Sequence, residues 1–161
     1  MRGPLEGVRI LDLTRLLPGA FCTMLLADLG ADILKVEEPP RGDPIRWLPA
    51  SLQASHLHRI LNRNKRSLTL NLRTQAGREI LLQLVREADV LVESFRPGVM
   101  DRLGLGYDAL RNVNPGLVYC AITGYGQDGP YRDLPGHDLN YMGFAGALEL
   151  FGSEGSPPTV P

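Results

Sequence analysis

The sequence predicts an α/β fold in which helices cover both faces of a parallel β-sheet. Short apolar segments with β-branched residues alternate with segments of helical periodicity, and glycine and proline separate them. The 161 residues suffice for one domain with a hydrophobic core. Alternating strands and helices form parallel strands joined by right-handed crossovers, so a ligand is expected beyond the carboxyl ends of the strands.

The first two strands and the helix between them are marked by clear breaks. A strand is expected over residues 8–13, and Pro18-Gly19 ends it. A helix follows over residues 20–30, with Gly30 as its C-terminal stop. The second strand covers residues 32–39, where two consecutive prolines begin.

The middle of the chain is expected to hold one or two helical turns within residues 54–61 and a third strand over residues 67–72, whose apolar residues alternate. Thr74 is suited to cap a helix over residues 75–88. One face of that helix should carry the apolar stripe Ile80, Leu81, Leu84 and Val85.

The remaining elements repeat the alternation. A fourth strand is expected over residues 89–95, followed by a short helix over 97–105 with proline in its first turn. A further helix covers residues 107–115 and a fifth strand residues 116–126. A last helix is expected over residues 138–151.

Composition excludes several functional classes. A net charge of −1 gives no field that attracts nucleic acid or an anionic membrane, and no apolar run has the length of a membrane span. Cys22 and Cys120 lie in apolar surroundings, which fits reduced thiols in a cytoplasmic protein. No glycine-rich phosphate loop indicates NAD or ATP, and His56 and His58 lack further ligands nearby for a metal.

Arginines follow the expected strands at the points where these strands end. Arg41 follows the second strand, Arg73 the third, and Arg96 and Arg102 the fourth. Because these ends meet at one edge of a parallel sheet, the four side chains could converge on an anionic ligand. Separate, solvated arginines are an equally good interpretation of the spacing alone.

His137 and Asp138 stand between a loop rich in glycine, proline and aspartate and the start of the last helix. A histidine at this place can serve as a general base or acid near a ligand. Local chemistry favours a plainer interpretation, a structural histidine near a helix start with Asp138 supplying N-terminal charge.

Four extended motifs carry a resemblance to a known family. They are ADLGADILKVEEPPRGD, NRNKRSLTLNL, ADVLVESFRPGVMDRLGLGYD and TGYGQDGPYRDLPGHDLNY. In this order they resemble the class III CoA-transferase, or CaiB/BaiF, family over nearly the whole chain. The resemblance implies a Rossmann-like parallel sheet that forms the N-terminal part of the family's large domain.

The resemblance also implies an organisation of the whole protein. Residues 1–151 are expected to form the CoA-binding part of the large domain, and residues 152–161 to begin a connecting segment that is cut short. The family's small domain is then absent. Full-length subunits are expected to interlock as a homodimer. The expected substrate is an acyl-CoA, with coenzyme A as part of the substrate and no separate cofactor or metal.

By position, seven residues are similar to the family's CoA contacts: Arg41, Leu70, Arg73, Ser94, Phe95, Arg96 and Arg102. Arginines can pair with the phosphates of CoA, and Leu70 and Phe95 can offer apolar surface to adenine or to the pantetheine arm.

The stretch GHDLNY and the tail SPPTVP resemble the α-methylacyl-CoA racemases of the family more than its transferases. This favours racemisation of a 2-methylacyl-CoA, with His137 and an aspartate expected just after Pro161 flanking the α-carbon. Asp138 would support the histidine or cap the helix. Two alternatives remain: a transferase that moves CoA between carboxylic acids, with the same aspartate as nucleophile, and an inactive CoA-binding fragment.

Overall fold

The computed structural model describes residues 3–47, 54–153 and 155–157. The chain divides into two compact units, unit 1 with residues 1–122 and unit 2 with residues 123–161. Within the described residues, no helix has the length and apolar character needed to cross a bilayer.

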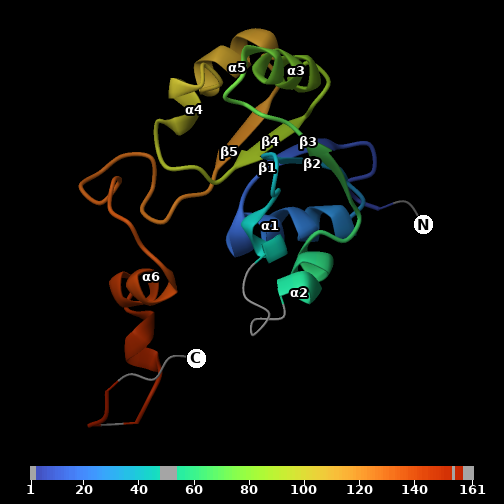
Figure 1. Cartoon of the computed structure of the whole chain (residues 1–161). Coiled ribbons are helices and arrows are strands. Elements are labelled where there is room, and N and C mark those ends of the chain that lie inside the picture. The colour runs from blue at the N-terminus through green and yellow to red at the C-terminus, as the bar shows by residue number, and fades with distance from the viewer. Residues whose placement is uncertain (1–2, 48–53, 154, 158–161) are drawn as a thin grey trace. The chain divides into compact units, whose positions relative to one another are not determined.

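Unit 1 is built on a five-stranded parallel sheet with strand order β3-β2-β1-β4-β5. Its elements in chain order are β1 (Arg9–Leu13), α1 (Leu16–Asp28), β2 (Asp32–Glu37), η1 (Pro44–Trp47), α2 (Ala54–Leu61), β3 (Lys65–Thr69), α3 (Gln75–Val85), β4 (Val90–Glu93), α4 (Val99–Arg102), α5 (Tyr107–Val113) and β5 (Val118–Ala121). Helices α1 and α2 lie on one face and α3 and α5 on the other, as Figure 1 shows. The predicted α/β fold is confirmed.

The core of unit 1 has two layers because the sheet is covered on both faces. Leu91 from β4 packs with Leu81 of α3 and Leu110 of α5, and all three are fully buried. On the opposite face, Ile10 and Ile33 pack with Ala27 of α1 and with Ala31. Apolar residues that point to both faces of a strand, as in β4, are typical of buried parallel sheets.

Several boundaries differ from the expectation. Helix α1 begins at Leu16 rather than at residue 20, because Pro18 lies in its first turn, where a missing N–H costs no hydrogen bond. Strand β3 covers Lys65–Thr69 instead of residues 67–72, as its register with β2 requires. In α3, Ile80 is 42% exposed, so the buried stripe is narrower than predicted.

Unit 2 contains α6 (Asp138–Phe144) and the 3-10 helix η3 (Ala147–Leu150). The single helix expected over residues 138–151 is thus interrupted. Gly146 adopts a left-handed backbone conformation with φ of 72° between the two helices, which ends α6.

An aromatic cluster holds the glycine-rich segment of unit 2 against α6. Its members are Tyr125, Tyr131, Tyr141 and Phe144, with ring centroids 5.0 to 6.0 Å apart. The Tyr141 hydroxyl also donates a hydrogen bond to the carbonyl oxygen of Gly136 at 2.6 Å. Edge-on and tilted ring pairs of this kind add stabilisation beyond the area they bury.

Candidate functional site

A cavity of about 490 Å³ opens at the carboxyl ends of the strands in unit 1. This volume lies within the usual range for small-molecule sites. Its lining comes from the carboxyl ends of four neighbouring strands and the segments that follow them: residues 13–16 at β1, 35–38, 42 and 43 at β2, 70, 72 and 73 at β3, and 94–96 at β4. Helix α4 and the residue after it add Val99, Arg102 and Leu103. The cavity therefore lies where a parallel sheet is expected to bind its ligand.

Six of the seven residues expected to contact CoA line this one cavity, namely Leu70, Arg73, Ser94, Phe95, Arg96 and Arg102. Arg41 does not line it, although its neighbour Gly42 does. The Arg41 guanidinium instead stacks over the Trp47 ring at 5.4 Å. The sheet thus brings together arginines that the sequence spacing alone left open as separate, solvated side chains.

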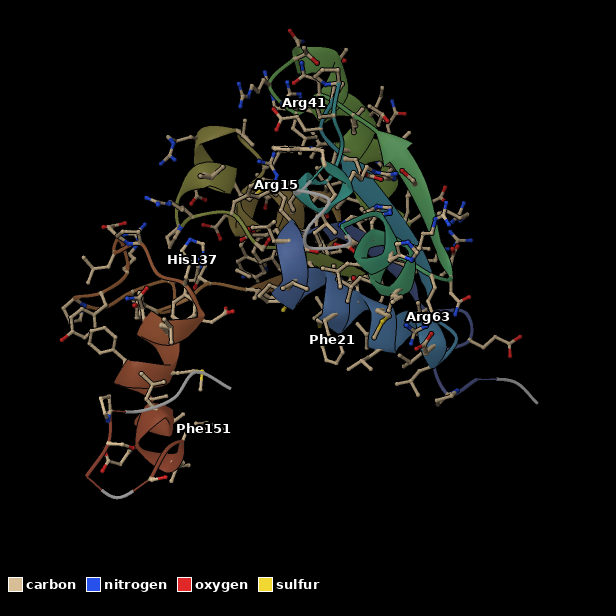
Figure 2. The ribbon with its side chains drawn as sticks, turned by 60° about the horizontal axis from the view of Figure 1, so that its bottom comes forward. Arg15, Phe21, Arg41, Arg63, His137 and Phe151 are labelled. Carbon is tan, nitrogen blue, oxygen red and sulfur yellow. The ribbon has the colours of Figure 1, made fainter. Side chains whose placement is uncertain are left out.

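Arg15 also lines the cavity, and the sequence did not point to it. Figure 2 shows it at the start of α1, with Arg63 at the far end of that helix. Its guanidinium lies 5.0 Å from the centroid of the Phe95 ring and 2.6 Å from a Glu38 carboxylate oxygen. The other Glu38 oxygen lies 3.2 Å from Arg73, so one carboxylate holds two cavity arginines.

Arg96 and Arg102 differ from this pair in having no neutralising partner. Within the part of the chain that the structure describes, no carboxylate forms an ion pair with either guanidinium. Both side chains line the cavity and belong to exposed residues. They therefore give one wall of the cavity uncompensated positive charge, which suits phosphate or carboxylate.

The pKa values of two carboxylates near the strand ends are shifted in opposite directions. Burial opposes the charge on Glu37, but hydrogen bonds from Arg46, Asp43 and Ser67 outweigh it and lower the Glu37 pKa to about 2. Burial raises the pKa of Glu93, which the Phe95 N–H and the Tyr119 hydroxyl offset only in part. Glu37, which lines the cavity, is thus a fixed negative charge at neutral pH.

His137 and Asp138 belong to unit 2, where His137 is the N-cap of α6 and Asp138 is its first residue. Both are exposed, and Figure 2 labels His137 where the glycine-rich segment meets the helix. The His137 N–H donates to Asn140 Oδ1 at 3.0 Å, and the Asn140 N–H donates to the His137 carbonyl oxygen at 2.9 Å. These two hydrogen bonds use the backbone of His137 and fix the start of α6.

Histidine, cysteine and carboxylate side chains in the described residues nowhere form a group of three that could hold a metal ion. The charged groups of the cavity are arginines, two glutamates, and a buried lysine with its carboxylate partner, and Thr14 and Ser94 add polar groups. This set suits an organic anion with hydrogen-bond donors and acceptors.

The comparison with known families decides the relationship. A family model described as CoA-transferase family III matches residues 5–161. The chain belongs to CoA-transferase family III. Among solved structures of this family, a CaiB/BaiF family protein from Brucella suis superposes with a TM-score of 0.91 and 39% sequence identity. That match covers 100% of this chain and 44% of the other.

Two curated relatives in family III are transferases by name. The acetyl-CoA:oxalate CoA-transferase of Acetobacter aceti is 43% identical over 159 residues, which cover 98% of this chain and 41% of the relative. The human succinyl-CoA:glutarate CoA-transferase is 42% identical over 160 residues, which cover 98% of this chain and 36% of the relative. The chain thus spans about two fifths of the length of these family III proteins.

The polar floor of the cavity consists of Lys35, Thr14 and Asp43, which were not expected from the sequence. A signal for it exists. Asp12 and Lys35 are charged residues inside the apolar strands RILDL and DILKVE. Charge inside a strand covered on both faces requires a partner, so these two positions predict an ion pair even without coordinates.

Proposed function

We propose that the protein binds CoA thioesters in the cavity of unit 1 and, within the whole protein, transfers CoA between carboxylic acids. The observation that carries the proposal is the convergence of arginines and apolar side chains on one cavity at the strand ends. The names of the relatives, CoA-transferases for oxalate and glutarate, support transfer more than racemisation.

The cavity residues suit different parts of CoA. Arg73, Arg96 and Arg102 would pair with phosphate oxygens, because a guanidinium presents parallel N–H donors to such groups. Leu70 and Phe95 would contact adenine or the pantetheine arm. Arg41, whose neighbour Gly42 lines the cavity, would add a further contact only if its guanidinium left the Trp47 ring.

Transfer requires a nucleophile that carries the acyl group and then CoA. A carboxylate can attack the thioester to give an enzyme-bound anhydride and release the CoA thiolate, which then forms a thioester with the enzyme as the first acid leaves. The family resemblance expects this carboxylate just after Pro161. The contribution of residues 1–161 is then to bind the CoA part of the substrate.

The test compares arginines at the two ends of the sheet in the intact protein. Arg96→Ala and Arg102→Ala should each raise the KM for the CoA thioester by about tenfold or more, as expected for losing a charged hydrogen bond. Arg9→Ala is the matched control, because Arg9 pairs with Glu87 at the amino end of β1. Equal effects of all three substitutions, or no binding of CoA, would refute the proposed site.

A second candidate is α-proton exchange on a 2-methylacyl-CoA, which the exposed His137 at the end of the glycine-rich segment favours. A neutral imidazole would accept the proton on one face while an acid donates on the other. The two functions separate in deuterium oxide. Exchange at the α-carbon that His137→Ala abolishes supports racemisation, whereas CoA transfer between acids without exchange supports a transferase.

A further inference from the structure

We propose that Lys35 is a positioning residue that ties together the two loops on the floor of the cavity, through the Thr14 carbonyl oxygen and the Asp43 carboxylate. The inference rests on the proposed CoA site, because it assigns these loops a part in shaping that site. The sequence holds only two lysines, Lys35 and Lys65, and the structure buries the side chains of both.

The Lys35 ammonium lies between the two loops. Lys35 is in β2, its side chain is 2% exposed, and it lines the cavity. Its Nζ donates to the Thr14 carbonyl oxygen at 2.9 Å and lies 2.9 Å from Asp43 Oδ2. Asp12 Oδ2 is 3.8 Å away. A buried ammonium requires such partners, and here two of them belong to different cavity loops.

The first loop, residues 14–16, joins β1 to α1 and includes the first residue of that helix, and all three of its residues line the cavity. Leu16 has a φ of 61°, a left-handed conformation that a non-glycine residue keeps only where its surroundings enforce it. The Arg15 N–H donates to Ser94 Oγ at 2.8 Å, which fixes the loop to the end of β4. Lys35 supplies the anchor one residue earlier, at Thr14.

The second loop, residues 42–45, lies after β2 and includes the first two residues of η1. Asp43 is its centre, because its N–H donates to Glu37 Oε2 at 2.8 Å and its Oδ1 accepts from the Ile45 N–H at 2.9 Å. A long contact of 3.5 Å joins Asp43 Oδ1 to the Leu16 N–H of the first loop. The Lys35–Asp43 ion pair is therefore the short, charged link between two loops that otherwise share one weak hydrogen bond.

Lys65 provides a matched control inside the same cluster. Its side chain is 1% exposed, and its Nζ lies 3.2 Å from the same Asp12 carboxylate. Its other partners are Thr23 Oγ1 at 2.7 Å, the Ala20 carbonyl oxygen at 3.0 Å and Asn62 Oδ1 at 3.1 Å. None of these residues lines the cavity. Removing Lys65 therefore disturbs an equally buried ion that contacts neither loop directly. It reaches the first loop only through Asp12, whose Oδ1 accepts hydrogen bonds from the Thr14 N–H and hydroxyl.

Hydrogen–deuterium exchange on the intact protein without ligand tests the link directly. Lys35→Met should speed exchange of the amides of residues 14–16, 42, 43 and 45 by about tenfold or more, because local opening of these loops becomes easier. Lys65→Met should change the amides of residues 42, 43 and 45 less than about twofold and act instead near residues 20–23. Equal acceleration of the loops by both substitutions, or none by Lys35→Met, would overturn the proposal.

Asp43→Asn is the second variant, because it keeps the volume and the Oδ1 acceptor while it removes the charge that Lys35 pairs with. It should also speed exchange in both loops, even if Lys35→Met does not fold. An Asp43→Asn protein that cannot fold contradicts the inference, since the link would then be a requirement for folding and not for the cavity.

Binding of CoA by calorimetry connects the loops to the site. Lys35→Met or Asp43→Asn should raise the Kd for CoA by about tenfold, while Lys65→Met stays within about twofold of the parent. If the parent protein binds no CoA, the proposed function fails while the exchange experiment still decides the role of Lys35. If the parent binds CoA and all variants keep its Kd, the positioning role is wrong.

Discussion

Unit 1 fixes its cavity with a two-layered core and buried ions, whereas the described residues of unit 2, which carry His137, include none that is buried. In unit 1 the side chains of Asp12, Lys35 and Lys65 are at most 2% exposed. In unit 2, four aromatic rings in contact and the hydrogen bond from Tyr141 to Gly136 hold the glycine-rich segment against α6. The proposed ligand site and the candidate catalytic histidine therefore belong to parts of unequal local stability.

This contrast has a physical consequence for function. A site at the ends of a packed sheet has preformed geometry, which suits the recognition of a large and constant group. A segment rich in glycine, held by a few ring contacts, can adjust to a variable acyl group. We therefore expect substitutions in unit 1 to act on stability and CoA affinity, and substitutions in unit 2 to act mainly on local order and on chemistry.

The largest expected effect is on the core of unit 1. Leu91→Ala should lower the free energy of unfolding by about 2–5 kcal/mol, because it leaves a cavity in a fully buried layer. Phe144→Ala in unit 2 removes a ring that is 61% exposed and should cost about 0.5–1.5 kcal/mol. Denaturant titration followed by circular dichroism measures both. Equal losses would erase the distinction between the two units.

The next largest effect on stability is expected from the buried charge of Glu37. Because its pKa is lowered from 4.5 to about 2, its ionisation stabilises the fold above pH 4.5, and this stabilisation is lost as pH falls through about 2. Glu37→Gln should cost about 1.5–3 kcal/mol at pH 7. Its unfolding free energy should also depend less steeply on pH between these values.

Glu93→Gln is the control for Glu37, because burial raises the Glu93 pKa instead. A raised pKa means that the parent protein gains stability from this group as pH falls, so Glu93→Gln should change the pH dependence with the opposite sign. Titration of the unfolding free energy from pH 7 to pH 2 separates the two. If both substitutions change the slope of the unfolding free energy against pH with the same sign, the pKa values of Glu37 and Glu93 are not shifted in opposite directions.

Much of unit 1 follows from its sequence for identifiable reasons. Apolar strands between glycine and proline breaks determine the parallel sheet, and a parallel sheet places Arg73, Arg96 and Arg102 at one edge. The predicted start of α1 at residue 20 was wrong, because Pro18-Gly19 is as typical of a break between elements as of a first helical turn. Local signals cannot separate these two uses of proline.

The charges inside β1 and β2 predict that Asp12 and Lys35 need partners, but they do not identify the contacts at the floor of the cavity. Lys35 meets Thr14 only after β1 and β2 pair, and it meets Asp43 only after the segment that follows β2 folds back. Arg41 lies outside the lining because the loop after β2 turns it towards Trp47. The expectation of racemisation rested on His137, and the relatives' names moved the proposal to CoA transfer.

A smaller effect is expected where Gly124 meets the aromatic cluster of unit 2. A Cβ atom at Gly124 would lie 2.3 Å from Tyr141 Cε1, so Gly124→Ala should displace the ring and cost about 1–3 kcal/mol. Gly143→Ala is the control, because its Cβ would lie 3.6 Å from Leu148 and alanine favours the helix. Near-ultraviolet circular dichroism of the tyrosines should change only for Gly124→Ala.

The smallest effects should come from the helix caps of the two units. Thr74 Oγ1 accepts a hydrogen bond from the Gly77 N–H at 3.1 Å, so Thr74→Ala should cost about 1 kcal/mol. His137 caps α6 through backbone contacts that alanine preserves, so His137→Ala should cost less than about 0.5 kcal/mol. A larger loss, measured by thermal unfolding, would give the imidazole a structural role. If the loss stays small, any effect of His137→Ala on α-proton exchange or CoA transfer belongs to the chemistry and not to the fold.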